Sequence, residues 1–307
     1  MPRAVASGTS VAAAPVPARP RGGLDELLDR CAARLRVAFV DMDGTLLLPD
    51  GTLPPATAAV VDRLEATGVR LVPATGRALW AARAALGDVA DRVDLVAGNG
   101  SDVVVGGRPV VHLAYGRAEL QGLLDAARHD PDRPGLIVYD ARRPYQLNLE
   151  ADFFARALPG LRDDAPRFTP VDKLPPGEIV KAALVARSDV EGVIRRLGAA
   201  FAGTYALSAC GWHWIDVALP DAGKDRGARR VLDALGAAAD DAIAFGDSMN
   251  DAPLMRMVGA GVAVANAMPE LKRLCAFEIG SNAQAAVIDA LAAIARRREL
   301  LGCGASR

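Results

Sequence analysis

The chain has 307 residues, which is enough for two domains or for one catalytic domain that carries a large insertion. Its 51% hydrophobic and 24% charged residues exclude a wholly disordered or collagen-like protein. The 36 basic and 37 acidic side chains leave a formal net charge of -1, so no global charge attracts nucleic acid or an anionic membrane. A negatively charged ligand therefore has to be small and held locally.

Three apolar strands, each followed by a polar cluster, are predicted at 35–40, 69–73 and 95–97, with helices between them at 54–67 and 79–86. Loops that follow parallel strands meet at one edge of the sheet, so we expect the three clusters to surround one crevice. The clusters are Asp41-Met42-Asp43-Gly44-Thr45, Ala74-Thr75-Gly76-Arg77 and Gly98-Asn99-Gly100.

The β-α-β pattern loosens after about residue 113 and resumes after Lys224. The intervening strands and helices predict a small α+β domain inserted into the first one. Its strands are expected near 136–139, 145–149, 179–185, 205–208 and 214–218, and its helices near 119–128 and 190–201. The returning pattern contains strands at 242–245 and 262–265 and a closing helix at 283–298.

The predicted fold class is therefore α/β, with a doubly wound, Rossmann-like parallel sheet as the core and an inserted α+β cap domain. The core is expected to comprise residues 34–112 and 214–307, and the cap residues 113–213. Residues 1–33 are expected to be a flexible leader and a first helix. The Ala- and Pro-rich leader lacks the apolar stretch of a signal peptide, although Ala-rich cleavage sites leave a processed leader open.

The cysteines and the apolar windows indicate a cytoplasmic protein. The four cysteines are widely spaced without a CxxC pair, which favours reduced thiols over a zinc ribbon or a disulfide scaffold. The least charged window, 198–215, is broken by glycine and polar residues, so no transmembrane helix is expected. The cysteines are Cys31, Cys210, Cys275 and Cys303.

Asp41 and Asp43 follow the first predicted strand, two residues apart. Carboxylates placed in this way repel each other unless a cation lies between them, so the pair indicates a bound metal, and oxygen ligands favour Mg²⁺. We expect Asp41 to be ionised at neutral pH and able to act as a nucleophile, and Asp43 to act as a general acid and then as a base. The alternative is that both acids only end the strand.

Three further motifs extend this interpretation. Thr75 and Gly76 end the second strand, where a hydroxyl and a backbone N–H suit phosphate oxygens, although Thr-Gly is also common in turns. Lys224 is suited to neutralise a phosphate and the nucleophile together, whereas a lone lysine is usually a solvated surface residue. Asp247 and Asp251 follow another apolar strand and predict one direct metal ligand and one supporting group.

Taken in order, these motifs resemble those of the haloacid dehalogenase (HAD) superfamily. More narrowly, the chain resembles the Cof-type phosphatases of subclass IIB, whose C2-type cap is inserted between the second and third motifs, where the insertion falls here. The resemblance extends from Leu35 to about Leu291 and includes Gly98-Asn99-Gly100 and residues 261–267. The motifs are Asp41-Met42-Asp43-Gly44-Thr45, Thr75-Gly76-Arg77, Lys224 and Gly246-Asp247-Ser248-Met249-Asn250-Asp251.

The resemblance implies that Asp41 forms an aspartyl-phosphate while Asp43 protonates the leaving group and later activates water. Thr75 and Lys224 would hold the phosphoryl group, as phosphoryl transfer depends mainly on positioning and charge neutralisation. The resemblance also implies that Asn250 lies near the phosphate and that Mg²⁺ is bound by the Asp41 side chain, the Asp43 backbone carbonyl and Asp247, with Asp251 bound directly or one shell out.

Two further groups of residues bear on this interpretation. The family often has a glycine after the lysine, where this chain has Asp225, which puts the local turn and the phosphate affinity in doubt. In the cap, candidates for contact with the leaving group are Arg142, Arg143 and Tyr145, whose alternative role is plain surface. Trp212 and His213 lie where the chain returns to the core, and His112 and His129 are expected at the surface or in packing.

The sequence thus predicts a magnesium-dependent phosphatase that hydrolyses a small soluble phosphomonoester, such as a sugar phosphate or a phosphorylated cofactor. We expect no nucleic-acid or membrane partner, and the oligomeric state stays open. One alternative is a sugar phosphomutase of the same superfamily. A more remote alternative is a non-enzymatic phospho-aspartate receiver, but receivers are shorter and lack the second acid cluster at Asp247 and Asp251.

Overall fold

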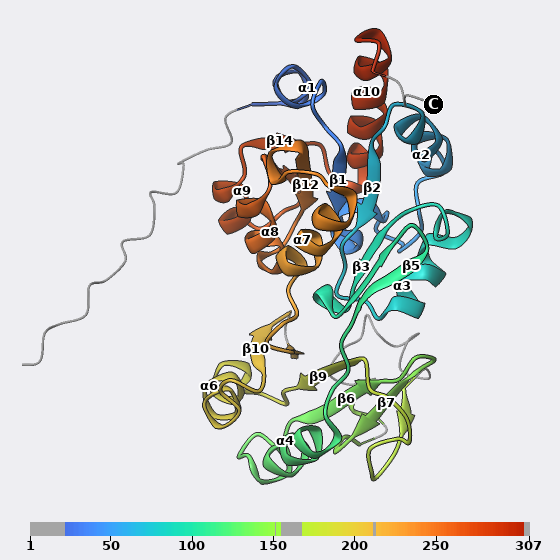
Figure 1. Ribbon diagram of the computed structural model, residues 1–307. Helices are drawn as coiled ribbons and strands as arrows, with labels where there is room; N and C mark the ends of the chain where they lie inside the picture. The colour runs from blue at the N-terminus through green and yellow to red at the C-terminus, as the bar shows by residue number, and fades with distance from the viewer. Residues whose placement is uncertain (1–21, 151, 155–167, 211–212, 304–307) are drawn as a thin grey trace, which may run out of the picture.

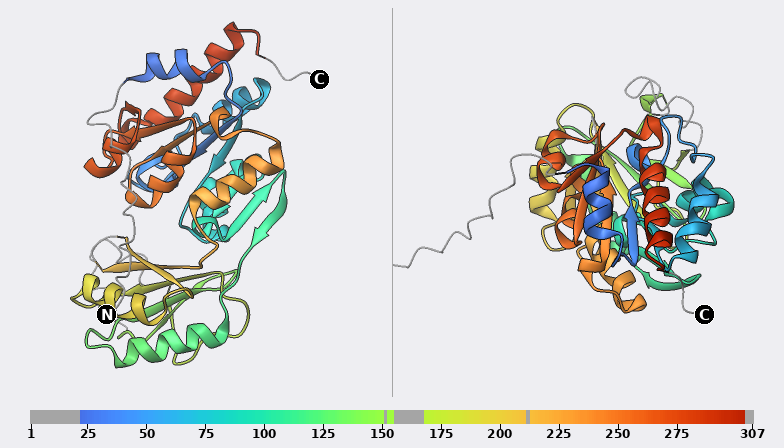
Figure 2. Two further views of the ribbon diagram at one scale, coloured as in Figure 1. Left: turned by 60° about the vertical axis from the view of Figure 1, so that its left-hand side comes forward. Right: turned by 90° about the horizontal axis from the view of Figure 1, so that it is seen from above.

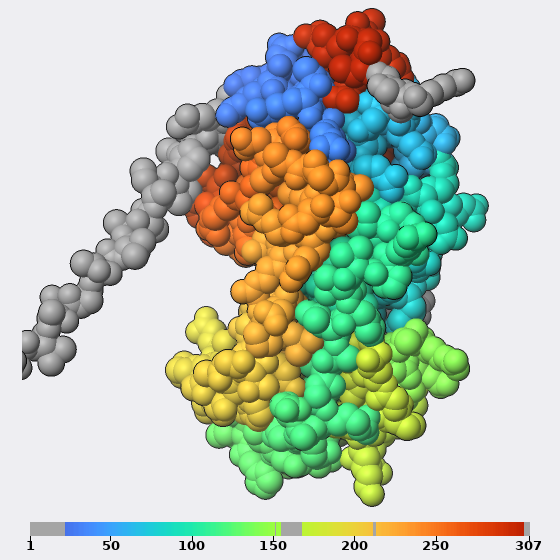
Figure 3. All heavy atoms as spheres, viewed as in Figure 1, coloured from blue at the N-terminus to red at the C-terminus, as the bar shows by residue number. Residues whose placement is uncertain are grey.

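The structure is a computed structural model that describes residues 22–150, 152–154, 168–210 and 213–303. The chain forms a core and an insert, where the insert is the segment from 113 to 218 (Figure 1). Figure 3 shows the two parts meeting at a waist, which both linking segments cross. This arrangement agrees with the predicted α/β core that carries an inserted α+β domain.

The core sheet has five parallel strands in the order β14-β13-β12-β1-β2. Strand β1, which lies between the central strand β12 and the edge strand β2, aligns Val40 with Pro73 on one side and with Phe245 on the other, so these three strands end at the same level. This common end is where the sequence predicted the crevice. The strands are β1 (Val37–Val40), β2 (Arg70–Pro73), β12 (Ala242–Gly246), β13 (Ala260–Val264) and β14 (Phe277–Ile279).

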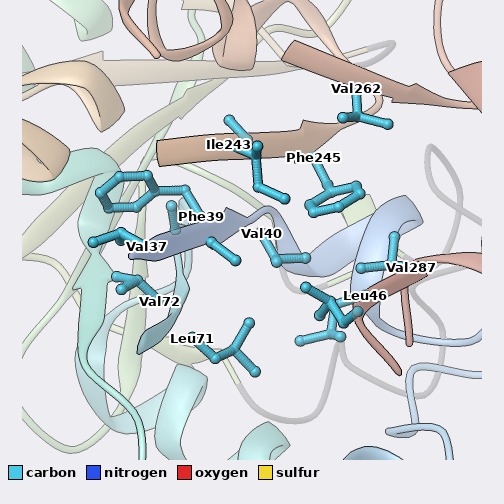
Figure 4. Close-up of a cluster of buried hydrophobic side chains, with 14 of the residues drawn as sticks. Val37, Phe39, Val40, Leu46, Leu71, Val72, Ile243, Phe245, Val262 and Val287 are labelled. Atoms are coloured by element: carbon cyan, nitrogen blue, oxygen red, sulfur yellow. The ribbon is translucent and has the colours of Figure 1, made fainter. Parts of the chain in front are cut away.

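Strands β1 and β12 are buried along their whole length because helices cover both faces of the sheet (Figure 2). Phe39, Ile243 and Phe245 are among the apolar side chains that fill the space on either side of β1 (Figure 4). No helix in the described ranges is long and apolar enough to cross a membrane. One group of helices contains α1 (Leu24–Cys31), α2 (Thr57–Ala66) and α10 (Ala286–Leu300), and another contains α7 (Lys224–Leu235), α8 (Ala252–Met257) and α9 (Pro269–Leu274).

The strand at 95–97 does not extend the parallel sheet as expected. After helix α3 (Leu79–Leu86), β3 (Leu95–Ala97) makes one parallel bridge, between Val96 and Ala74, and otherwise pairs antiparallel with β4 (Asp102–Val105). Strand β4 and its hairpin partner β5 (Arg108–His112) were not predicted from the sequence. Strand β4 runs antiparallel to β3 because the chain reverses at Gly98-Asn99-Gly100, where the φ values are 57°, 54° and 94°.

The insert is a six-stranded sheet in the order β10-β11-β9-β6-β7-β8, with helices α4 (Arg117–His129) and α6 (Val190–Ala200) packed on one face. Because side chains alternate along a strand, Val138, Leu184 and Ile215 lie under the helices, while Ile137 and Ala183 lie on the opposite face. The strands are β6 (Gly135–Tyr139), β7 (Pro144–Leu147), β8 (Thr169–Pro170), β9 (Lys181–Val185), β10 (Ala206–Ala209) and β11 (Trp214–Ala218).

The end of the insert differs from the boundary expected at residue 213. Strand β11 pairs with β9 and β10, so it is an internal strand of the six-stranded sheet and not part of the core. An apolar strand looks the same in either sheet, because only its hydrogen-bonding partners distinguish the two. We therefore propose a two-part division in which the chain returns to the core after Ala218.

The turn after β3 packs directly against the start of α7. A Cβ atom at Gly100 would lie 2.2 Å from the carbonyl oxygen of Gly223, the residue before Lys224. Gly100 also has a φ of 94°, which side-chain-bearing residues rarely adopt. This glycine therefore allows the β3–β4 turn to support the backbone that presents Lys224.

We predict that Gly100→Ala lowers the free energy of unfolding by about 3 kcal/mol or more, because backbone strain and a steric clash add. Gly107→Ala is the matched control, since Gly107 has a φ of 74° with no atom within 4 Å of the added Cβ, and it should cost about 1 kcal/mol. Urea denaturation of both variants measures the difference. Equal losses would show that the contact with Gly223 is unimportant.

Candidate active site

The carboxyl ends of β1, β2 and β12 bring the predicted motifs together. Asp41 follows β1, Thr75 follows β2 and Asp247 follows β12. The Asp41 N–H donates to the carbonyl of Phe245 at 3.0 Å, which holds the first motif to β12. Lys224 is the first residue of α7, so the helix start places its side chain at the same end of the sheet.

Lys224 links two of the predicted acids. Its Nζ donates to Asp41 Oδ1 at 2.5 Å and to Asp251 Oδ1 at 2.6 Å, and all three side chains are buried. Burial alone would lower the pKa of Lys224, but the carboxylates of Asp251 and Asp41 raise it above its ordinary value. The lysine is therefore a buried cation in a charge network and not a solvated surface residue.

Three carboxylates form a compact cluster. One oxygen each from Asp41, Asp247 and Asp251 lies within 4.8 Å of the others. A Cβ at Gly44 would lie 2.6 Å from Asp247 Oδ2, so only a glycine, which also tolerates the φ of 76°, lets the first motif approach so closely. Hard oxygen donors at this spacing fit Mg²⁺ better than a thiophilic metal.

The protonation of Asp41 depends on its neighbours. Burial raises its pKa well above the ordinary value, Lys224 opposes this shift, and Asp251 and Asp247 add to it. Burial also raises the pKa of Asp247, and Asp251 adds to this effect. Cationic charge beside Asp41, such as that of Lys224, therefore favours its ionised form.

Asp43 does not join the cluster. Its carboxylate, with 58% of the side chain exposed, accepts hydrogen bonds from Arg77 Nε at 2.9 Å and from Arg77 Nη2 at 2.6 Å. A metal contact for Asp43 is thus left to its backbone carbonyl, as the resemblance implies. This role of Arg77 was not predicted from the sequence, where the available signal was a planar donor pair two residues after Thr75 in the second motif.

The second motif, Thr75-Gly76-Arg77, forms a turn that offers a backbone donor to a ligand. The Thr75 hydroxyl accepts the Arg77 N–H at 3.1 Å, which turns the loop back over the strand end. Gly76 presents its carbonyl to Lys181 Nζ of the insert at 2.6 Å. Within the described ranges no protein group accepts the Gly76 N–H, so this donor suits a phosphate oxygen.

Asn250 and Asp225 lie outside the charge network. Asn250 is exposed, and its Oδ1 accepts from Ser248 Oγ at 2.6 Å, so the structure does not join it to Asp41 or Lys224. Asp225 occupies the first turn of α7, where a negative charge is favourable. Its side chain lies beside Gly223 and leaves the Lys224 contacts intact.

A loop outside the predicted motifs supports the site. Asn266 follows β13 and donates through Nδ2 to the carbonyl of Gly44 at 2.7 Å, while its Oδ1 accepts the Asn282 N–H at 3.0 Å. The Met268 N–H donates to the carbonyl of Asp247 at 2.8 Å. These bonds fix the first and fourth motifs relative to each other. The only sequence signal was the polar Asn266 after an apolar strand, within the family-like stretch 261–267.

The three residues of the insert that were candidates for contact with the leaving group lie in different surroundings. Tyr145 packs with the cluster under α4 and α6 and donates to Asp140 Oδ2 at 2.8 Å, so it faces away from the core. Arg142 and Arg143 are exposed in the β6–β7 turn, which contacts the core where Trp80 Nε1 donates to the Asp140 carbonyl at 3.1 Å. Their contact with a leaving group stays a prediction.

The histidines that the sequence singled out have different surroundings. Trp212 lies outside the described residues, and His213 Nδ1 lies 2.8 Å from the Ala186 carbonyl. His129 Nδ1 lies 2.7 Å from the Asp125 carbonyl on its own helix. His112 is more than a surface residue, because it lies between Asp102 in the core and Glu178 in the insert, at 2.5 and 2.8 Å. All four cysteines are free.

Known proteins resemble this chain along most of its length. Residues 38–291 match the haloacid dehalogenase-like hydrolase family. An HMP-PP phosphatase from Cronobacter sakazakii is 30% identical over 244 residues, covering 77% of this chain and 86% of that protein. A hypothetical protein from Geobacillus kaustophilus has a solved structure with a TM-score of 0.68 and 26% identity, covering 88% and 99% of the two chains.

A sugar phosphatase of HAD subclass IIB has the same fold, with a TM-score of 0.67 and 18% identity over 87% of this chain and 99% of that one. The family match over residues 38–291 spans the core motifs and the insert together, and the overall fold agrees with that of the solved structures. The chain therefore belongs to the haloacid dehalogenase-like hydrolase family and is a phosphatase of its Cof type.

Proposed function

We propose that this enzyme hydrolyses a small phosphate ester with Mg²⁺ as cofactor and Asp41 as the nucleophile. The observation that carries the proposal is the buried network in which Lys224 contacts both Asp41 and Asp251, next to Asp247. A nucleophile, a fixed cation and a cluster of oxygen ligands are what phosphoryl transfer requires in one place.

Asp41, Asp247 and Asp251 would hold the metal, together with the Asp43 carbonyl. Bound there, Mg²⁺ offsets the repulsion among the carboxylates and neutralises charge on the phosphoryl oxygens. The Thr75 hydroxyl, the Gly76 N–H and Lys224 Nζ would bind the phosphoryl oxygens, because β2 ends level with β1 and Lys224 Nζ contacts Asp41. Asn250 is proposed to turn from Ser248 toward the phosphate when substrate binds.

The chemistry divides into two displacements. In the first, a carboxylate oxygen of Asp41 bonds to phosphorus, the ester bond to the leaving oxygen breaks, and Asp43 gives that oxygen its proton. In the second, Asp43 takes a proton from water, the water oxygen attacks phosphorus, and the aspartyl-phosphate bond breaks to release phosphate. Asp43 ends protonated and Asp41 ends as a carboxylate, so both residues are restored.

The substrate class is proposed from the relatives. One is named an HMP-PP phosphatase and another a sugar phosphatase, which favours a small phosphorylated metabolite. The insert covers the site and would select among such compounds. Release of inorganic phosphate from a panel of about a hundred metabolite phosphates, with Mg²⁺ and with chelator, tests the class directly.

Asp41→Asn is predicted to lower kcat at least about a thousandfold, because the amide keeps the shape but is not a nucleophile. Lys224 keeps its contact with Asp251 in this variant, so we expect normal folding by circular dichroism. Phosphate release from p-nitrophenyl phosphate measures kcat. A variant that retains a tenth of the wild-type rate would remove Asp41 from the role of nucleophile.

Mg²⁺ is predicted to raise the melting temperature progressively with its concentration, with about 2.7 kcal/mol of stabilisation at a hundred times its Kd. Asp247→Asn should abolish this shift, while its stability without metal stays equal or rises because one of three clustered negative charges is removed. The control is Asp289→Asn, an exposed acid on α10. An unchanged Mg²⁺ shift in Asp247→Asn would contradict the proposed ligand set.

Arg77→Lys is predicted to slow hydrolysis of an alkyl phosphate about tenfold, while p-nitrophenyl phosphate changes less than about threefold. The two donors of Arg77 hold Asp43, lysine does not reproduce this paired geometry, and only the alkoxide needs the proton from Asp43. The control is Arg83→Lys on α3, whose arginine pairs with the exposed Asp91. Equal losses on both esters would assign Arg77 to phosphate binding instead.

A further inference from the structure

One face of the insert sheet is turned toward the core. The residues of β9 and β11 that lie under helices α4 and α6 include Leu184, Ile215 and Val217. By alternation, Lys181 and Asp216 lie on the opposite face, where they interrupt otherwise apolar strands. Ionisable residues in apolar strands are costly unless they have a partner, so their contacts indicate their role.

Both residues contact the loops that border the active site. Lys181 Nζ donates to the Gly76 carbonyl at 2.6 Å and lies 5.4 Å from the centre of the Tyr139 ring. Asp216 Oδ2 accepts from Asn99 Nδ2 at 3.0 Å. Gly76 follows β2 and Asn99 follows β3, so the insert places its charges beside the predicted phosphate-binding loop.

Asn99 has an unsatisfied acceptor at this point. Its Oδ1 is buried, and no donor among the described residues reaches it. The residue also adopts a φ of 54°, and a Cβ at Gly76 would lie only 3.1 Å from this Oδ1. An unpartnered buried acceptor costs about 1–3 kcal/mol, and such costs are concentrated at functional sites. The amide oxygen is therefore placed to receive a donor from a ligand.

Cys210 is close enough to both this group and the catalytic residues for their charges to act on its thiol. Cys210 is exposed, but partial burial of its thiol is the main cause that raises the pKa of this group to about 11. The charge of Asp216 also raises this pKa, Lys181 and Lys224 lower it, and Asp41 raises it. Charges from the insert and from the catalytic network thus act on one side chain.

We propose that Asp216 and Asn99 form the subsite that recognises the leaving group, and that this subsite selects leaving groups carrying amino or hydroxyl donors. The inference rests on the proposed function and specifies its substrate class. The carboxylate of Asp216 and the Asn99 oxygen are acceptors, so they bind N–H and O–H groups and repel a carboxylate on the substrate. Lys181 is a positioning residue, because its ammonium is held by the Gly76 carbonyl.

Three sugar phosphates of similar size test the selection: glucosamine 6-phosphate, glucose 6-phosphate and 6-phosphogluconate carry an ammonium, a neutral and a carboxylate leaving group. We expect kcat/KM to fall in that order for the wild type. Asp216→Asn should reduce the ratio between the first and the last about tenfold, roughly 1.4 kcal/mol. p-Nitrophenyl phosphate has no donor on its leaving group and should change less than about twofold.

Asn99→Gly is the second variant, because glycine accepts the positive φ without backbone strain and removes the amide. It should reduce the preference for amino and hydroxyl groups in the same direction. Asp172→Asn, an exposed acid of the insert, is the control and should leave the ranking unchanged. Each compound is also measured as an inhibitor of p-nitrophenyl phosphate hydrolysis, so a compound that is not turned over still reports its binding.

An unchanged ranking in Asp216→Asn, in both kcat/KM and inhibition, would overturn the subsite. Equal losses on all four compounds would also overturn it, because the pair would then only hold the insert against the core. Failure of the proposed function has a different signature: wild-type enzyme with Mg²⁺ would release no phosphate from p-nitrophenyl phosphate, or Asp41→Asn would release it at the wild-type rate.

Discussion

The buried ion pairs of Lys224 with Asp41 and Asp251 are the interaction on which the rest of the site depends. Charges removed from water are tolerated only when they are paired with good geometry, and removal of one partner leaves an uncompensated charge. The three residues come from the end of β1, the start of α7 and the loop after β12. The parallel register of the core sheet and the start of α7 therefore have to be correct together for any one of these charges to be stable.

Glycine makes this convergence sterically possible. Gly44 lets the first motif approach Asp247, Gly100 lets the β3–β4 turn approach the backbone before Lys224, and Gly246 leaves room for Asp251. At each position a Cβ would lie within 2.6 Å of another atom. The polar groups of the insert then close over the same region, because Lys181 and Asp216 bond to the loops after β2 and β3. His112 adds a contact between core and insert, and its pKa is raised first by Glu178 and then by Asp102.

The candidate site could be predicted in part from local patterns. Asp41, Thr75, Lys224, Asp247 and Asp251 each follow or precede an apolar element, and parallel strand ends have to meet at one edge. The pairing of Asp43 with Arg77 and the unpartnered oxygen of Asn99 could not be predicted, because each depends on loop conformations with side chains brought together by turns. The resemblance implies that Asn250 lies near the phosphate, and in this structure its side chain accepts a hydrogen bond from Ser248.

The sequence by itself determined the parallel core, the position of the insertion and the polar residues at the strand ends, because apolar runs and the residues that end them are local properties. Tertiary structure alone decided which face of each insert strand meets the core. Tyr145 lies under the helices while Lys181 and Asp216 face the site, and a shift of one residue in register would exchange these faces. Register is set by pairing between distant strands, as when β11 joins the insert sheet and not the core. Such long-range pairing leaves no signature within the strand itself.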